Sequence, residues 1–100
     1  TIKGYGSSLS LSSALSEGVR FGGPSLDLSY QSFTFEVWLY PGNLSSGYYG
    51  IVGQCSTQDA RACLHMTIRD GKLYMGFYSD DVDGLQILSS ATWYHAAYVY

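Results

Sequence analysis

The stretch that decides the fold runs from Cys63 to Tyr78 and reads CLHMTIRDGKLYMGFY. Asp70-Gly71 stands between two runs of alternating apolar and polar residues, and this dipeptide favours a type I′ turn, whose two central residues need positive φ. The turn predicts a β-hairpin and sets its register. One face then carries the apolar pairs Leu64 with Phe77, Met66 with Met75, and Ile68 with Leu73.

The opposite face of this hairpin is more polar and carries Cys63, His65, Thr67, Arg69, Lys72, Tyr74 and Tyr78. His65 is expected to face Gly76 across the hairpin. One side therefore packs into a core, while the other contacts solvent or a partner. Because a tyrosine ring offers apolar area with a hydroxyl at its edge, we expect a ligand surface on the polar side. Its members are His65, Thr67, Tyr74 and Tyr78.

The rest of the chain repeats the alternating pattern. Residues 33–40 predict a strand with four apolar side chains on one face, and residues 50–55, 85–88 and 93–100 predict further strands. Residues 1–13 predict an arm or short strand, residues 14–21 another short strand, and residues 79–84 an acidic loop. No segment has a helical period, so the sequence predicts an all-β antiparallel sandwich.

Composition limits the function classes. A chain of 100 residues with 46% hydrophobic residues predicts one domain with a core. Sixteen per cent of residues are aromatic, including ten tyrosines, so some rings must lie on the surface. The net charge of −3, with scattered cations, argues against nucleic-acid binding. No apolar run reaches the roughly 20 residues that a membrane-spanning helix needs.

Cys55 and Cys63 flank one predicted loop, and we favour a disulfide over two free thiols. Closing so short a loop contributes about 2–3 kcal/mol in the chain-entropy model. A zinc site is disfavoured because it needs more ligands at closer spacing. Asn43-Leu44-Ser45 is a sequon that follows the turn residues Pro41-Gly42, so Asn43 is a candidate glycan acceptor. Together these features predict a secreted or cell-surface glycoprotein.

Two segments carry a family resemblance. Residues 32–41, SFTFEVWLYP, and residues 93–100, WYHAAYVY, resemble two strands of the laminin-G-like, concanavalin-A-like jelly rolls. Gly50-Ile51-Val52 and the hairpin at Asp70-Gly71 lie between them in similar order, so the resemblance covers residues 14–100. It implies a jelly roll of two antiparallel sheets that binds glycans or proteins outside the cell, in some members with calcium.

The resemblance covers the N-terminal portion of such a domain. Jelly rolls of this family usually run about 150–200 residues, and the strands that follow the second segment have no counterpart here. Residues 93–100 are apolar on both faces, as in a central strand. We therefore expect a truncated or partner-completed jelly roll that self-associates through an open strand edge.

Candidate chemistry is sparse. Asp80, Asp81 and Asp83 form a candidate calcium loop, since calcium prefers several carboxylate and carbonyl oxygens, although a solvated acidic turn is the simpler interpretation. Glu36 has Thr34 and Trp38 as its same-face neighbours, without the second carboxylate that a glycosidase needs. His95, like His65, lies within a predicted strand and is interpreted as structural.

We therefore expect a non-enzymatic extracellular module for adhesion or for binding glycan or protein. The alternative is a structural subunit that assembles into a filament by strand addition.

Overall fold

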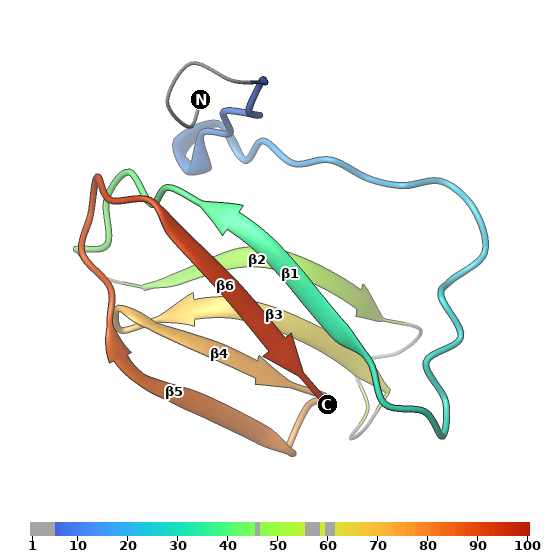
Figure 1. Cartoon of the computed structure of the whole chain (residues 1–100). Helices are drawn as coiled ribbons and strands as arrows, with labels where there is room; N and C mark the ends of the chain where they lie inside the picture. The colour runs from blue at the N-terminus through green and yellow to red at the C-terminus, as the bar shows by residue number, and fades with distance from the viewer. Residues whose placement is uncertain (1–5, 46, 56–58, 60–61) are drawn as a thin grey trace.

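The structure, a computed structural model, describes residues 6–45, 47–55, 59 and 62–100. Two antiparallel sheets face each other in it, which confirms the predicted all-β architecture (Figure 1). The smaller sheet pairs β1 (Thr34–Leu39) with β6 (Tyr94–Val99). The larger sheet has the order β2 (Tyr48–Cys55), β3 (Cys63–Arg69), β4 (Lys72–Gly76) and β5 (Asp81–Ile87).

The hairpin of β3 and β4 has the predicted register. Met66 pairs with Met75, Ile68 with Leu73, and His65 with Gly76. The turn residues Asp70 and Gly71 have φ of 49° and 76°, the left-handed values that the Asp-Gly dipeptide favours. The register is therefore fixed locally by the turn chemistry.

The core lies between the two sheets. From the larger sheet, Leu64, Met66 and Met75 are buried, and from β6 the buried residues are Ala96 and Tyr98. Met66 is only 1% exposed. Phe33, just before β1, and alternate residues of β1 complete the core from the smaller sheet, as the pattern of residues 33–40 predicts; the strand residues are Phe35, Val37 and Leu39.

Three local predictions are wrong. β4 ends at Gly76, so Tyr78 lies beyond the strand, with φ of 67°. β5 begins at Asp81, inside the stretch predicted as an acidic loop, and runs to Ile87. β6 is not a central strand, because among the described residues it pairs only with β1.

The described residues before β1 form no strand, so the strand predicted at residues 14–21 is also wrong. The only regular element there is η1 (Ser13–Leu15), a short 3₁₀ helix. The segment contacts the sandwich at Leu28, which packs against the core, and at Gln54 of β2. The Gln54 side chain donates to the Leu26 carbonyl at 2.8 Å and accepts from the Leu26 amide at 2.9 Å. The first five residues of the predicted arm, and most of the loop between the cysteines, lie outside the described residues.

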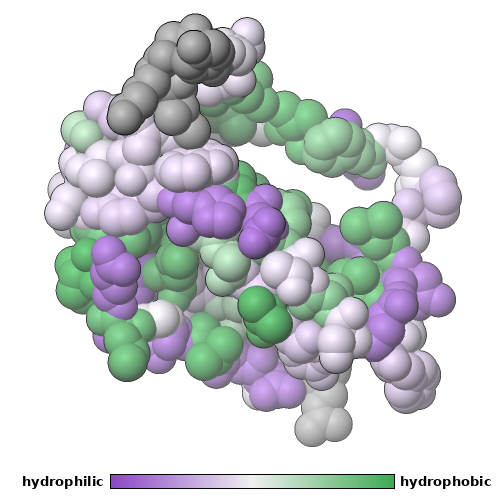
Figure 2. Space-filling view, viewed as in Figure 1, coloured by the Kyte–Doolittle hydropathy of each residue, from purple (hydrophilic) through white to green (hydrophobic). Residues whose placement is uncertain are grey.

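Most apolar side chains of residues 6–32 contact solvent. Exposed members are Leu9, Leu11, Leu15, Val19, Phe21 and Leu26. Figure 2 shows their apolar surface along the segment that stands away from the sandwich. An alternating pattern therefore did not suffice to make a strand here. Within the described residues, no helix is both long and apolar enough to cross a membrane.

Candidate functional site

The structure brings three of the four predicted ligand-surface residues together on the outer face of the larger sheet. His65 and Thr67 come from β3, and Tyr74 comes from β4. The rings of His65 and Tyr74 stack, with centroids 6.2 Å apart and planes 13° apart. Tyr78 does not join them, because it lies past the end of β4.

Arg69 adds a cation to this face. Its guanidinium lies 3.8 Å from the ring centre of Tyr74 and 4.7 Å from that of Tyr48 on β2. A guanidinium between two aromatic faces gains cation–π attraction while it covers apolar ring surface. These contacts therefore link β2, β3 and β4 on their outer face.

Asp81 closes the same cluster from β5. Its Oδ1 lies 3.4 Å from Nε2 of His65, and its Oδ2 accepts a hydrogen bond of 3.2 Å from the Tyr74 hydroxyl. The carboxylate reaches β3 by lying across Gly76, its partner in the β4–β5 ladder, where any Cβ would occupy the same space. Burial, and next to it the charge of Asp81, raises the pKa of Tyr74.

The polar groups of this face, which we call the β3–β4 outer face, largely bind one another. Lys72 and Asp83 also form an ion pair at 3.1 Å. Three buried atoms of this face, Nε2 of His65, Oγ1 of Thr67 and Nε of Arg69, have no hydrogen-bond partner among the described residues. The arrangement can hold four strands in register, and a ligand would have to compete with the internal partners of His65 and Tyr74.

The predicted calcium loop does not form as one loop. Asp81 and Asp83 project from β5 with the partners described above, whereas Asp80 lies in the turn before it. No group of three or more histidine, cysteine or acidic side chains suited to a metal ion occurs within the described ranges. Calcium binding stays a prediction.

The two predicted modification sites have clear places in the fold. Cys55 and Cys63 are directly paired across β2 and β3 and form the predicted disulfide. Asn43 lies in the exposed connection after β1, where its Oδ1 accepts a hydrogen bond of 2.9 Å from the Ser45 amide. Its glycosylation stays a prediction.

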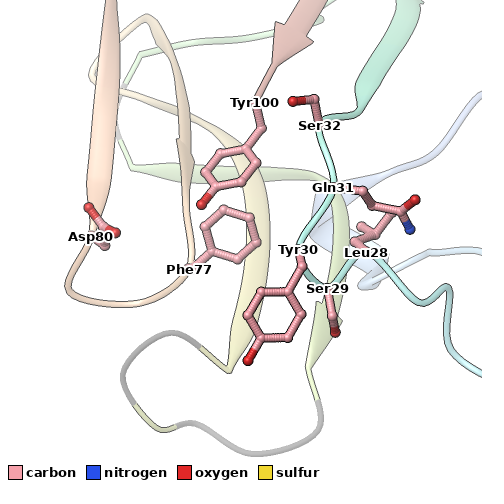
Figure 3. A pocket seen from close by; sticks show the side chains of 8 residues that line it. All are labelled: Leu28, Ser29, Tyr30, Gln31, Ser32, Phe77, Asp80 and Tyr100. Carbon is pink, nitrogen blue, oxygen red and sulfur yellow. The ribbon is translucent and has the colours of Figure 1, made fainter.

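A hollow that the sequence did not predict opens at one end of the sandwich. Its volume is about 450 Å³, and we call it the end hollow. It is lined by Leu28, Ser29, Tyr30, Gln31, Ser32, Phe77, Asp80 and Tyr100. Figure 3 shows residues 28–32 on one side, the turn between β4 and β5 on the other, and the ring of Tyr100 beside that of Phe77.

Aromatic rings form the inner side of the end hollow. Phe33 stacks on Tyr100 with centroids 5.5 Å apart, and Phe77 meets Tyr100 edge to face at 5.0 Å. Phe33 and Phe77 are themselves in edge contact at 6.3 Å. Such offset and edge contacts hold the three rings in place, so part of the Tyr100 ring is presented to solvent on a rigid support.

Polar groups form the rim. Asp27 organises one side, because its carboxylate accepts a hydrogen bond of 3.0 Å from the Ser29 amide and its carbonyl accepts one from the Gln31 side chain. The Ser29 hydrogen bond lowers the pKa of Asp27. On the other side, the Asp80 carbonyl accepts a 3.3 Å hydrogen bond from the Phe77 amide, which shapes the turn that carries the Asp80 carboxylate.

The end hollow combines apolar ring faces with one carboxylate, a carboxamide and several hydroxyls. This set suits a ligand that presents C–H surface and hydroxyls or a positive charge. Its residues escape sequence reasoning because three separate segments supply them. The one local signal is that an aromatic residue, Phe77, and an acidic residue, Asp80, lie only three positions apart in the sequence.

Residues considered for catalysis are dispersed. Glu36 is exposed on the outer face of β1, and His95 is on β6, 5.1 Å from the ring of Trp38. His65 has the structural partners already described.

Comparison with known proteins adds no relative. No protein-family profile, curated protein or solved structure matches this chain. The resemblance to laminin-G-like jelly rolls therefore stays a prediction that rests on residues 32–41 and 93–100. The classification that the structure supports directly is an all-β chain with two facing antiparallel sheets.

Proposed function

We propose that this protein is a non-catalytic extracellular module that binds glycan through the end hollow. The observation that carries the proposal is the meeting of a supported aromatic surface, Phe77 and Tyr100, with the carboxylate of Asp80 in one opening. The β3–β4 outer face is the weaker candidate, because its two carboxylates, Asp81 and Asp83, are already engaged by His65, Tyr74 and Lys72.

The chemistry of a sugar matches this lining. The C–H face of a pyranose ring packs on an aromatic ring, while a carboxylate accepts hydrogen bonds from its hydroxyls. Among the residues that line the end hollow, Asp80 is the only charged one. Neutral glycans are therefore favoured over sulfated or uronic-acid-rich ones, which the carboxylate repels.

Glycan-array binding, followed by calorimetry with the best neutral oligosaccharide, tests the proposal. Tyr30→Ala and Asp80→Asn should each weaken binding at least about tenfold, which corresponds to about 1.4 kcal/mol. Phe21→Ala is the matched control, since Phe21 is also an exposed aromatic but does not line the end hollow. Binding that all three variants retain would contradict the site, and binding of cationic peptides alone would contradict the ligand class.

Calcium is proposed only as an accessory ligand at Asp80. Of the three acidic residues predicted for it, Asp80 alone lines the end hollow. A calcium titration of glycan affinity tests this role. Affinity that rises with calcium in the wild type, but not in Asp80→Asn, would support it; the same response in both proteins would contradict it.

The extracellular setting is supported by the Cys55–Cys63 disulfide, because such bonds persist in oxidising compartments. The exposed sequon at Asn43 is compatible with the same setting. Expression through a secretory pathway, with a mass shift that peptide N-glycosidase removes and Asn43→Gln abolishes, tests this assignment.

A structural subunit that assembles by strand addition is the second candidate function. The observation that favours it is the edge of β6, which no strand among the described residues covers. This edge is separate from the end hollow along most of its length.

A further inference from the structure

The outer edge of β6 pairs with no strand among the described residues and is open for strand pairing. Phe33 and Tyr100 exchange two backbone hydrogen bonds, of 3.1 and 3.0 Å, at the end of the β1–β6 ladder. In an antiparallel ladder, bonded and non-bonded pairs alternate. Tyr94, Ala96 and Tyr98 therefore bond to β1, while His95, Ala97 and Val99 direct their amides and carbonyls toward the other edge.

Beside this edge the core is uncovered. A groove of about 230 Å³ runs between β6 and the inner face of β4 and β5. Its apolar members are Leu73, Met75, Val82, Ala97, Tyr98 and Val99. Val82 pairs with the buried Met75 yet is 61% exposed, because β1 and β6 do not extend over β5 (Figure 1).

A strand added to β6 would satisfy both features together. Its backbone would pair with the edge groups of β6, and alternate side chains would fill the groove. The occupant must therefore be extended, with apolar side chains at every second position and polar ones between them.

The chain itself contains such a segment, which lies outside the strands of both sheets. Residues 7–12 read SSLSLS, and Leu9 and Leu11 are 67% and 51% exposed. These leucines are two positions apart, so they would enter the groove together while the serines face solvent.

We infer that β6 and its groove accept residues 7–12 of a second copy of this chain, which deepens the second candidate function and is independent of the end hollow. Reciprocal exchange closes a dimer, whereas one-way donation propagates into a filament. The proposal thus explains one open edge and one exposed amphipathic segment by a single contact.

Analytical ultracentrifugation of the whole chain across a concentration series tests this inference. The wild type should self-associate, and a chain that stays monomeric throughout would overturn the proposal. Ala97→Pro should abolish self-association, because it removes an edge amide that bonds to no strand in the described part of the chain. Glu36→Pro is the matched control: Glu36 is the ladder partner of Ala97, and its amide points to the opposite edge of the sheet.

The donor is tested separately. Leu9→Ser with Leu11→Ser should dissociate the assembly, whereas Val19→Ser with Phe21→Ser, also an exposed alternating pair, should not. Circular dichroism of every variant checks that the sandwich is retained. Assembly that survives Ala97→Pro would show that the edge of β6 is not the acceptor. Assembly that survives the leucine changes would show that residues 7–12 are not the donor. Glycan affinity should persist in all monomeric variants, so failure here is distinguishable from failure of the glycan site.

Discussion

Residues 7–21 contain two alternating apolar pairs, Leu9 with Leu11 and Val19 with Phe21, and residues 63–76 alternate on both sides of their turn, but only the second stretch forms strands. The hairpin has a turn that brings its two runs together within two residues, and its inward side chains are buried under β1 and β6. The N-terminal stretch has η1 in place of a two-residue hairpin turn, and its apolar residues contact solvent. Alternation therefore shows that a segment can be half-buried, while a partner decides whether it becomes a strand.

The strongest test of this comparison removes one apolar side chain from each region. Met66→Ala should destabilise the domain by about 2–5 kcal/mol, because Met66 is almost fully buried in the core. Leu15→Ala should change the free energy of unfolding by less than about 0.5 kcal/mol, since Leu15 is exposed on η1. Urea denaturation, fitted with one m-value for all variants, measures both changes in the free energy of unfolding. Equal losses would mean that the N-terminal segment is packed in solution.

A second test asks whether the outer side of the hairpin depends on a single small residue. Gly76→Ala should destabilise by about 1–3 kcal/mol, because its Cβ would displace the Asp81 carboxylate from His65 and Tyr74. Gly50→Ala is the control, as a Cβ there meets no atom of the described residues within 4 Å. The double variant Gly76→Ala with Asp81→Ala should recover part of the loss. A Gly76→Ala protein as stable as Gly50→Ala would contradict this account.

The third test concerns Tyr98, the largest side chain that β6 places in the core. Its hydroxyl is buried without a hydrogen-bond partner among the described residues, so Tyr98→Phe should stabilise by about 1 kcal/mol. Thermal unfolding at neutral pH measures this change. A clear loss of stability would mean that the hydroxyl has a partner in solution.

Alkaline pH sharpens the same test. Burial raises the pKa of Tyr98 to about 12 from 10.0, so the folded protein holds this proton more tightly than the unfolded chain. The resulting stability is fully present below about pH 10 and is lost as the pH rises toward 12. Tyr98→Phe should reduce this loss of stability at alkaline pH. Tyr30→Phe, which alters an exposed tyrosine, should not. Equal slopes for all three proteins would contradict the assignment.

The smallest expected effect concerns the two hydrogen bonds that join residues 6–32 to the sandwich. Gln54→Ala removes both hydrogen bonds to Leu26 and should cost about 0.5–1.5 kcal/mol at most, because both partners can rebind water. Hydrogen exchange should quicken at Leu26 but not at Met66. Uniform quickening would show that residues 6–32 are part of one cooperative unit with the sandwich.

Most of the sandwich was predictable because its signals are local. The Asp-Gly turn fixed the hairpin, alternation fixed β1, and the disulfide followed from two cysteines at facing strand ends. The strand predicted at residues 85–88 covered only the end of β5. Its first residues were missed because Asp81 and Asp83 resemble loop residues; they are tolerated in a strand by pairing with His65, Tyr74 and Lys72 across the sheet. The end hollow was missed because residues 28–32, 77–80 and 100 meet only after the sheets have packed.

The sequence by itself determined the turn, the register and the inward face of the hairpin, since these depend on φ preferences and on the two-residue period of a strand. It also determined which cysteines could pair. Only the tertiary structure decided which alternating segments became strands, which edge of β6 stayed open and where rings from distant segments met. Those outcomes depend on long-range packing, where burial against a particular neighbour outweighs local propensity.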